Sequence, residues 1–148
     1  MVDTSAFYAL EDASDAHHGQ AVALRDGLKD PRFRLFTTNL VLAESITLLT
    51  YRLGAEHAVR FADLAYSSER LQVIRMTEDL ERAAVERLRR TRDDELSFVD
   101  ASLIECVERW DIDRIFAFDR DFVRHGRRLL APADIAGGRR ERKRRNRG

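Results

Sequence analysis

The sequence predicts an α/β fold in which a short parallel β-sheet is flanked by helices on both faces, as an α/β/α sandwich. Short apolar segments rich in aromatic and β-branched residues alternate with longer stretches of helical periodicity. Only two prolines and seven glycines occur among the 148 residues, of which 44% are hydrophobic and 35% charged. This composition is typical of a helix-rich globular domain that is long enough to bury its own core.

The first quarter of the chain predicts two strands separated by two helices. Residues 1–3 have the character of the end of a strand, and residues 5–10 begin a helix. Residues 15–29 form a second helical stretch, which the breaker Asp30-Pro31 ends. Residues 33–37 (FRLFT) are a strand candidate because of their aromatic and β-branched side chains.

The next two elements are both helices. Thr38 or Asn39 can cap a helix that runs to about Leu53 and stops before Gly54, and residues 55–67 form another. The first of these helices should be well buried because its apolar positions cover much of its circumference: Leu40, Val41, Ile46, Leu48, Leu49 and Leu53. For the same reason we expect core positions at Phe7, Tyr8, Leu10, Tyr51 and Leu53.

The rest of the chain continues the alternation of strand and helix. Further strands are expected at residues 71–76 (LQVIRM), 115–118 (IFAF) and, at the sheet edge, 128–130. Further helices are expected at residues 78–90, 97–110 and 119–124. In such parallel sheets, functional residues collect at the carboxyl ends of the strands.

The chain has no net charge, but its charge is unevenly distributed. The last twelve residues, GGRRERKRRNRG, carry seven basic side chains and one acidic side chain, for a net charge of +6. Because the whole chain is neutral, residues 1–136 carry −6. The two glycines at 137–138 mark a domain edge, so we expect a domain at 1–136 and a disordered basic tail at 137–148.

Composition also narrows the cellular setting. The single cysteine, Cys106, excludes an internal disulfide and fits a reducing compartment, and its apolar neighbours predict a buried structural thiol. No apolar run approaches the roughly 20 residues of a membrane helix. The start, MVDTSAFYALED, lacks the features of a signal peptide. We therefore expect a cytoplasmic protein.

Four acidic residues occupy positions where a parallel sheet collects functional groups. Asp3 ends the first strand, Asp119 follows a later strand, and Asp121 comes two residues after it. Asp100 lies in the first turn of a helix, and Glu44 lies inside an apolar helix. Taken singly, the aspartates can be helix caps, and Asp100 is spaced for a capping box with Ser97.

Glu44 is harder to explain structurally. It shares a helix face with Val41 and Leu48, where an ionised and unpaired carboxylate costs several kcal/mol. No basic residue lies three or four positions away to pair with it. It therefore needs a cation, a hydrogen-bond partner or a raised pKa, and a metal ion would meet that need.

Together the four acids predict a metal site. Carboxylates clustered at low effective dielectric repel one another unless divalent cations lie between them. Oxygen-only ligands suit Mg²⁺ or Mn²⁺ rather than zinc. The sequence leaves open whether one or two ions bind.

Four segments that carry these acids resemble the motifs of PIN-domain ribonucleases, in order: VDTSAFYAL, TNLVLAES, LSFVDASL and FAFDRDF. The likeness covers about residues 1–135. The residues DTS in the first segment and FDRDF in the last resemble those of the VapC toxins of type II toxin–antitoxin pairs. The resemblance implies a PIN-like fold and an Mg²⁺- or Mn²⁺-dependent endoribonuclease that forms a homodimer and has an antitoxin partner. It implies a metal-binding and catalytic set of Asp3, Glu44, Asp100 and Asp119, with Thr4, Ser5 and Asp121 as auxiliary residues. The basic tail is not part of the family pattern.

An acidic site needs cationic side chains nearby to hold RNA. Candidate phosphate-binding residues are Arg120, Arg124, Arg139, Arg140, Arg142, Lys143, Arg144 and Arg145. Flexible arginine-rich segments bind phosphates without reading bases, so the tail is a candidate general RNA binder. It can equally be a solubilising end or an appended sequence.

Three functions remain open at this point. The first is a toxin that cleaves RNA, inhibits translation and is controlled by an antitoxin. The second is a PIN-type nuclease of RNA processing that has no antitoxin. The third is a catalytically silent nucleic-acid-binding module. The sequence does not choose between transfer RNA and ribosomal RNA as the target.

Overall fold

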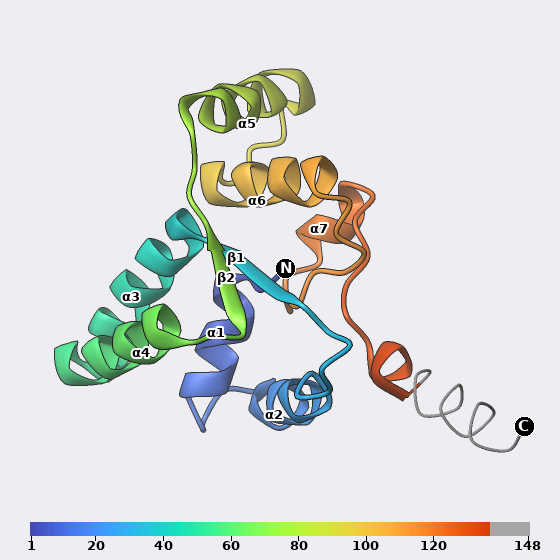
Figure 1. The fold of residues 1–148 in the computed structure, drawn as a ribbon. Coiled ribbons are helices and arrows are strands. Elements are labelled where there is room, and N and C mark those ends of the chain that lie inside the picture. The colour runs from blue at the N-terminus through green and yellow to red at the C-terminus, as the bar shows by residue number, and fades with distance from the viewer. Residues whose placement is uncertain (137–148) are drawn as a thin grey trace, which may run out of the picture.

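The computed structural model describes residues 1–136 and confirms the predicted α/β architecture (Figure 1). Its helices are α1 (Thr4–Glu11), α2 (His18–Gly27), α3 (Asn39–Leu53), α4 (Ala55–Ser67), α5 (Glu78–Thr91), α6 (Phe98–Arg109) and α7 (Asp121–Arg124). Its two continuous strands are β1 (Leu35–Thr38) and β2 (Leu71–Ile74). The tail proposed at 137–148 lies outside the described residues.

The sheet is parallel, as predicted, but within residues 1–136 it has fewer continuous strands than the sequence predicted. β1 pairs with β2 in the register Leu35 opposite Leu71. The other predicted strands add only isolated parallel bridges, Val2 with Phe116 and Ile115 with Leu129. The amide of Val2 also donates to the carbonyl of Phe36 at 2.7 Å, so residues 1–3 lie between β1 and the 115–117 segment. The strands are short because helix caps and turns begin immediately after them.

Local sequence explains where the helices begin and end. Thr38 ends β1 and also caps α3, since its side chain accepts a hydrogen bond from the amide of Val41 at 3.1 Å. Gly54 separates α3 from α4 with φ of +94°, a conformation that favours glycine. The second helix begins at His18 rather than at 15, because the Asp15 carboxylate accepts the amide of His17 in a preceding turn.

Helices lie on both sides of the sheet (Figure 1). α3 packs along α4 and contacts α1, while α5 packs along α6. The largest fully buried side chains come from α3, α5, α6, α7 and the strand segments, among them Leu42, Leu49, Leu80, Leu103, Ile104, Ile115 and Phe122. One contiguous core therefore holds the strand ends in place. Within residues 1–136, no helix combines the length and apolarity needed to cross a membrane.

The predicted core positions are confirmed only in part. Phe7 is buried, and Tyr8, Leu10 and Leu53 are half-buried. The prediction for Tyr51 is wrong, because its side chain is 84% exposed. It lies two residues beyond the buried Leu49, which places it on nearly the opposite face of α3. Cys106 is buried as predicted, and burial raises the pKa of its thiol to about 11.

Candidate functional site

Asp3 is a buried carboxylate at the carboxyl end of the first sheet segment. Its amide donates to the carbonyl of Phe116 at 3.0 Å, and its side chain is part of a residue only 4% exposed. Its Oδ2 accepts hydrogen bonds from the amide of Ser5 at 3.0 Å and from the Ser5 hydroxyl at 2.7 Å. Asp3 thus serves as the N-cap of α1, which is the structural role that its position also predicts.

The surroundings of Asp3 disfavour its negative charge. Burial raises its pKa to about 6; the hydrogen bonds from Ser5 oppose that shift, and the nearby charge of Asp100 adds to it. A buried acid that titrates near neutral pH gains from a neighbouring cation. A cation beside this carboxylate would favour its ionised form and lower the pKa.

Asp100 is presented by the first turn of α6. It forms the predicted capping box, with its Oδ2 accepting the Ser97 amide at 3.2 Å and the Ser97 hydroxyl at 2.6 Å. Burial raises the pKa of Asp100, and the charge of Asp119 raises it further; Ser97 and His125 act in the opposite direction. Asp100 therefore shares an electrostatic environment with both Asp3 and Asp119.

Asp119 and Asp121 extend this environment at the start of α7. Asp119 is exposed, and its Oδ1 accepts the amide of Asp121 at 2.8 Å in a turn. Burial raises the pKa of Asp121, with the charge of Asp119 as a second cause. The acids at 3, 100, 119 and 121 come from three distant segments, and the charge of each influences that of a neighbour in the series: Asp100 acts on Asp3, and Asp119 acts on both Asp100 and Asp121.

Glu44 is joined to the start of α1, next to Asp3, through Thr4. The hydroxyl of Thr4, which is buried at the start of α1, donates to Oε2 of the half-buried Glu44. Glu44 therefore has a neutral hydrogen-bond partner. This is one of the three ways, beside a cation and a raised pKa, in which a carboxylate on the apolar face of α3 can be accommodated. Thr4 and Ser5, both predicted as auxiliary residues, connect Glu44 and Asp3 respectively to α1.

The carboxylates do not form a ready-made metal cage. Within residues 1–136, no three histidine, cysteine or acidic side chains are spaced to hold an ion as they stand. The donor chemistry nevertheless fits Mg²⁺ or Mn²⁺, because every candidate ligand is a carboxylate oxygen and two of the acids have raised pKa values. Asp3, Asp100 and Asp119, with Glu44 behind Thr4, are the residues that would hold the ion.

The predicted RNA-binding arginines have different surroundings. Arg120 is exposed beside Asp119. Arg124 lies within 2.6 Å of carboxylate oxygens of both Glu95 and Asp121, so much of its charge is already neutralised. The candidates at 139–145 lie outside the described residues.

Two histidines near the acids have contacts that sequence reasoning missed. His125 pairs with Asp93 at 3.0 Å, which ties the end of α7 to the loop before α6. His17, which is exposed, stacks on Phe118 with ring centroids 4.5 Å apart, next to Asp119. No local motif signals either contact, because the partners are distant in sequence.

Comparison with known proteins identifies several relatives of the chain. The family model for the PIN domain matches residues 1–128. The chain is 41% identical over 126 residues to the 23S rRNA-specific endonuclease VapC20 of Mycobacterium tuberculosis, covering 85% of this chain and 93% of that protein. It is 32% identical over 125 residues to a VapC ribonuclease of Archaeoglobus fulgidus, covering 82% and 78% respectively.

A solved structure agrees with these relatives. The crystal structure of Mycobacterium tuberculosis VapC20, described as a sarcin-ricin loop cleaving toxin, superposes with a TM-score of 0.81 and 38% identity. The superposition covers 88% of this chain and 98% of that chain. The fold, the matched segment and the sequence identity agree, and the chain belongs to the PIN-domain family.

Proposed function

We propose that this chain is a divalent-metal-dependent endoribonuclease that acts as the toxin of a VapBC-type toxin–antitoxin pair. The observation that carries the proposal is the convergence of three carboxylates from distant segments: Asp100 lies close enough to Asp3 and to Asp119 for like charges to repel. The similarity to a ribonuclease and an rRNA endonuclease of the VapC type supports the same activity.

The chain's own residues have separable roles in the proposed reaction. Asp3, Asp100 and Asp119 hold the cation, and Glu44 contributes its charge from behind Thr4. Ser5 keeps the Asp3 carboxylate in place, and Ser97 does the same for Asp100. When bound, Mg²⁺ or Mn²⁺ lowers the pKa of a coordinated water and stabilises charge on the leaving oxygen. An external water as nucleophile leaves a 5′-phosphate and a 3′-hydroxyl.

Ribosomal RNA is the substrate class that we propose. The VapC20 relative is described as 23S rRNA-specific, and its structure as that of a toxin that cleaves the sarcin-ricin loop. Cleavage of ribosomal RNA would inhibit translation and would place the activity in the cytoplasm. Transfer RNA, which the sequence left open, is the comparison substrate.

The direct test incubates the purified protein with ribosomes, and separately with transfer RNA, in Mn²⁺, in Mg²⁺ and in EDTA. We expect metal-dependent cuts in ribosomal RNA whose new ends carry a 5′-phosphate, and Asp100→Asn should abolish them. Asp63→Asn, which alters an exposed carboxylate of α4, is the matched control and should cut normally. Cleavage by Asp100→Asn at the wild-type rate would refute the assigned site.

An antitoxin partner and a homodimer are further parts of the proposal. An apolar groove of about 290 Å³ lies between α1, α2 and α4 and includes Phe7, Leu10, Phe61 and the 69%-exposed Leu64. We propose that the antitoxin docks in this groove. Co-purification with the product of a short neighbouring gene, lost in Leu64→Glu, would support docking there. If none of the proteins encoded by neighbouring genes inhibits the nuclease when mixed with it, the chain is instead an RNA-processing enzyme without an antitoxin.

A further inference from the structure

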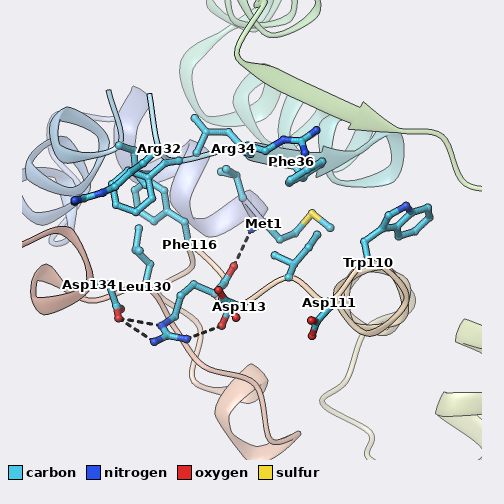
Figure 2. Close-up of a pocket in the computed structure, with 16 residues that line it drawn as sticks. Met1, Arg32, Arg34, Phe36, Trp110, Asp111, Asp113, Phe116, Leu130 and Asp134 are labelled. Carbon is cyan, nitrogen blue, oxygen red and sulfur yellow. Dashed lines mark hydrogen bonds and ion pairs between the residues drawn. The ribbon is translucent and has the colours of Figure 1, made fainter. Parts of the chain in front are cut away.

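A groove at the opposite end of the sheet from the carboxylates has a different chemistry. It encloses about 510 Å³ and is lined by the start of β1, by the segment after α6 and by residues near 130 (Figure 2). A second hollow continues from it over the sheet and shares Arg34, Phe36 and Trp110 with it. We call the two together the aromatic–arginine groove. Asp3, Glu44, Asp100 and Asp119 do not line it.

The groove exists because one sheet face is incompletely covered. Leu71 lines the apolar groove on the α4 side, and Leu35, its partner in register, lines that groove as well as the edge of this one. Phe36 and Gln72, the next pair, point to the other face because side chains alternate along a strand. Phe36 is half-buried and Gln72 is exposed, so α5 and α6 leave this part of the sheet open.

Aromatic rings and guanidinium groups lie together in the groove (Figure 2). The Arg32 guanidinium lies 4.4 Å from the centroid of the Phe33 ring, and that of Arg34 lies 5.5 Å from the Phe36 ring. Trp110, at the end of α6, is 45% exposed. This combination of rings on a strand and at a helix end with adjacent arginines is the surface on which proteins stack unpaired bases.

The charge of the groove is opposite to that of the rest of the domain. Its lining contains five arginines, at 32, 34, 75, 109 and 114, against three aspartates, at 111, 113 and 134. Within residues 1–136, Arg34 and Arg109 enter no ion pair, whereas Arg114 is paired with Asp134 at 3.0 Å. A cationic groove on a domain of charge −6 selects an anionic occupant. The chain's own tail, which carries +6, has the wrong sign.

We propose that the aromatic–arginine groove binds a single-stranded segment of RNA, with a base stacked on Trp110 or Phe36 and phosphates held by Arg34 and Arg109. The inference rests on the proposed ribonuclease function and adds a second contact for the same RNA, remote from the scissile bond. Such a contact raises affinity without taking part in the chemistry. It also supplies the cationic surface that the paired Arg124 near the acids does not.

The test uses Trp110 as its own probe, because the chain contains one tryptophan. A short single-stranded RNA is titrated into the full-length protein in EDTA, which prevents metal-dependent cleavage. We expect the RNA to quench the tryptophan fluorescence and a duplex of the same sequence to bind more weakly. Equally tight binding of the duplex would overturn the proposal, because the groove would then not distinguish single strands. Equal quenching by poly-glutamate would also overturn it, in favour of an acidic protein as the occupant.

Variants assign the binding to the groove. Labelled RNA followed by anisotropy should bind about tenfold more weakly to Trp110→Ala. Arg34→Gln and Arg109→Gln should each weaken binding and reduce the salt dependence of log K by about 0.7. Arg60→Gln removes the same charge from α4, where Arg60 pairs with Glu56, and should bind as wild type. Groove variants that bind as tightly as wild type would overturn the proposal.

Cleavage assays separate this inference from the proposed function. Arg34→Gln should raise KM while leaving the single-turnover rate at saturating RNA unchanged, whereas Asp100→Asn should lose cleavage but retain groove binding. If Asp100→Asn still cleaves, the active-site assignment fails and the groove is judged by binding alone. If Arg34→Gln lowers the saturated rate without affecting binding, the groove assignment fails and the active site stands.

Discussion

The Ser5 hydroxyl accepts a hydrogen bond from the amide of Phe118 at 3.0 Å, although the two residues are 113 positions apart. The same hydroxyl donates to Asp3 at 2.7 Å. One side chain therefore joins the first acid of the site to the residue that precedes Asp119. This link adds to the backbone pairing of residues 1–3 with the 115–117 segment, and together they hold Asp3 and Asp119 at the same end of the sheet.

Replacing Ser5 with alanine should affect both stability and the titration of Asp3. The free energy of unfolding should fall by about 1 kcal/mol, because the side-chain hydrogen bonds are lost while the amide cap remains. The pKa of Asp3 should rise further, since the hydrogen bonds of Ser5 now lower it. Urea unfolding and the pH–rate profile measure the two effects. Ser5→Thr keeps the hydroxyl and should resemble wild type in both measurements. If the acid limb of the pH–rate profile does not shift in Ser5→Ala, Ser5 does not affect the pKa of Asp3.

Asp3 should make the metal-free protein less stable as the pH rises. Its carboxyl titrates near pH 6 in the folded state, above the ordinary value of 3.8, so the folded state binds the proton more tightly than the unfolded state. The stabilising contribution is complete below about pH 4 and is lost as the pH rises through 6, with a total of about 3 kcal/mol. Asp3→Asn lacks this titration.

The measurement is urea unfolding in EDTA at several pH values between 4 and 7.5, for wild type and Asp3→Asn. Subtracting one curve from the other removes the contributions of carboxylates such as Asp12, whose pKa is lowered by hydrogen bonds from Ser14 and Tyr8. The free energy of unfolding of Asp3→Asn minus that of wild type should increase as the pH rises from 4 to 7.5. A difference that stays constant across this range would mean that Asp3 titrates normally.

Glu44→Gln separates charge from hydrogen bonding on α3. A glutamine oxygen can still accept the Thr4 hydroxyl, so the free energy of unfolding should change by less than about 1 kcal/mol. Metal-dependent cleavage should fall at least tenfold, because one negative charge is lost from the site. Thr4→Val, in contrast, leaves the carboxylate without its partner and should destabilise the fold. If Glu44→Gln cleaves normally, Glu44 is a structural residue of the α1–α3 contact.

Removal of residues 137–148 tests the basic tail. The salt dependence of log K for single-stranded RNA should decrease, by up to about 5 if all seven basic side chains contact phosphates. Metal binding by the remaining chain should not change. An unaltered salt dependence would leave the tail as a solubilising or appended segment.

Local patterns were sufficient to predict most of the helices. α3 ends at Leu53 before Gly54, and α6 begins after Ser97, because capping residues and glycine act within a few positions of the chain. The extent of the strands was less predictable. Pairing depends on distant segments, and residues 1–3 and 115–118 form only single bridges although their composition is that of strands.

For the candidate site, the sequence predicted the local hydrogen bonds, such as the capping box of Ser97 and Asp100, but not those between distant segments. The acids at 3, 100 and 119 could be placed at one pole because parallel strands align their carboxyl ends. The contacts of Thr4 with Glu44 and of Arg124 with Glu95 join residues 40 and 29 positions apart, beyond any local pattern. For that reason the sequence pointed to a metal ion as the partner of the Glu44 carboxylate, whereas the structure also provides the hydroxyl of Thr4.

Binding of Mn²⁺ at pH 7.5, followed by electron paramagnetic resonance of the free ion, tests most directly whether the acids form one cation site. The wild-type protein and Asp63→Asn should take up Mn²⁺ with equal affinity, while Asp3→Asn, Asp100→Asn and Asp119→Asn should each bind it at least about tenfold more weakly. Undiminished uptake by all three variants would contradict the assignment of a shared metal site to these residues.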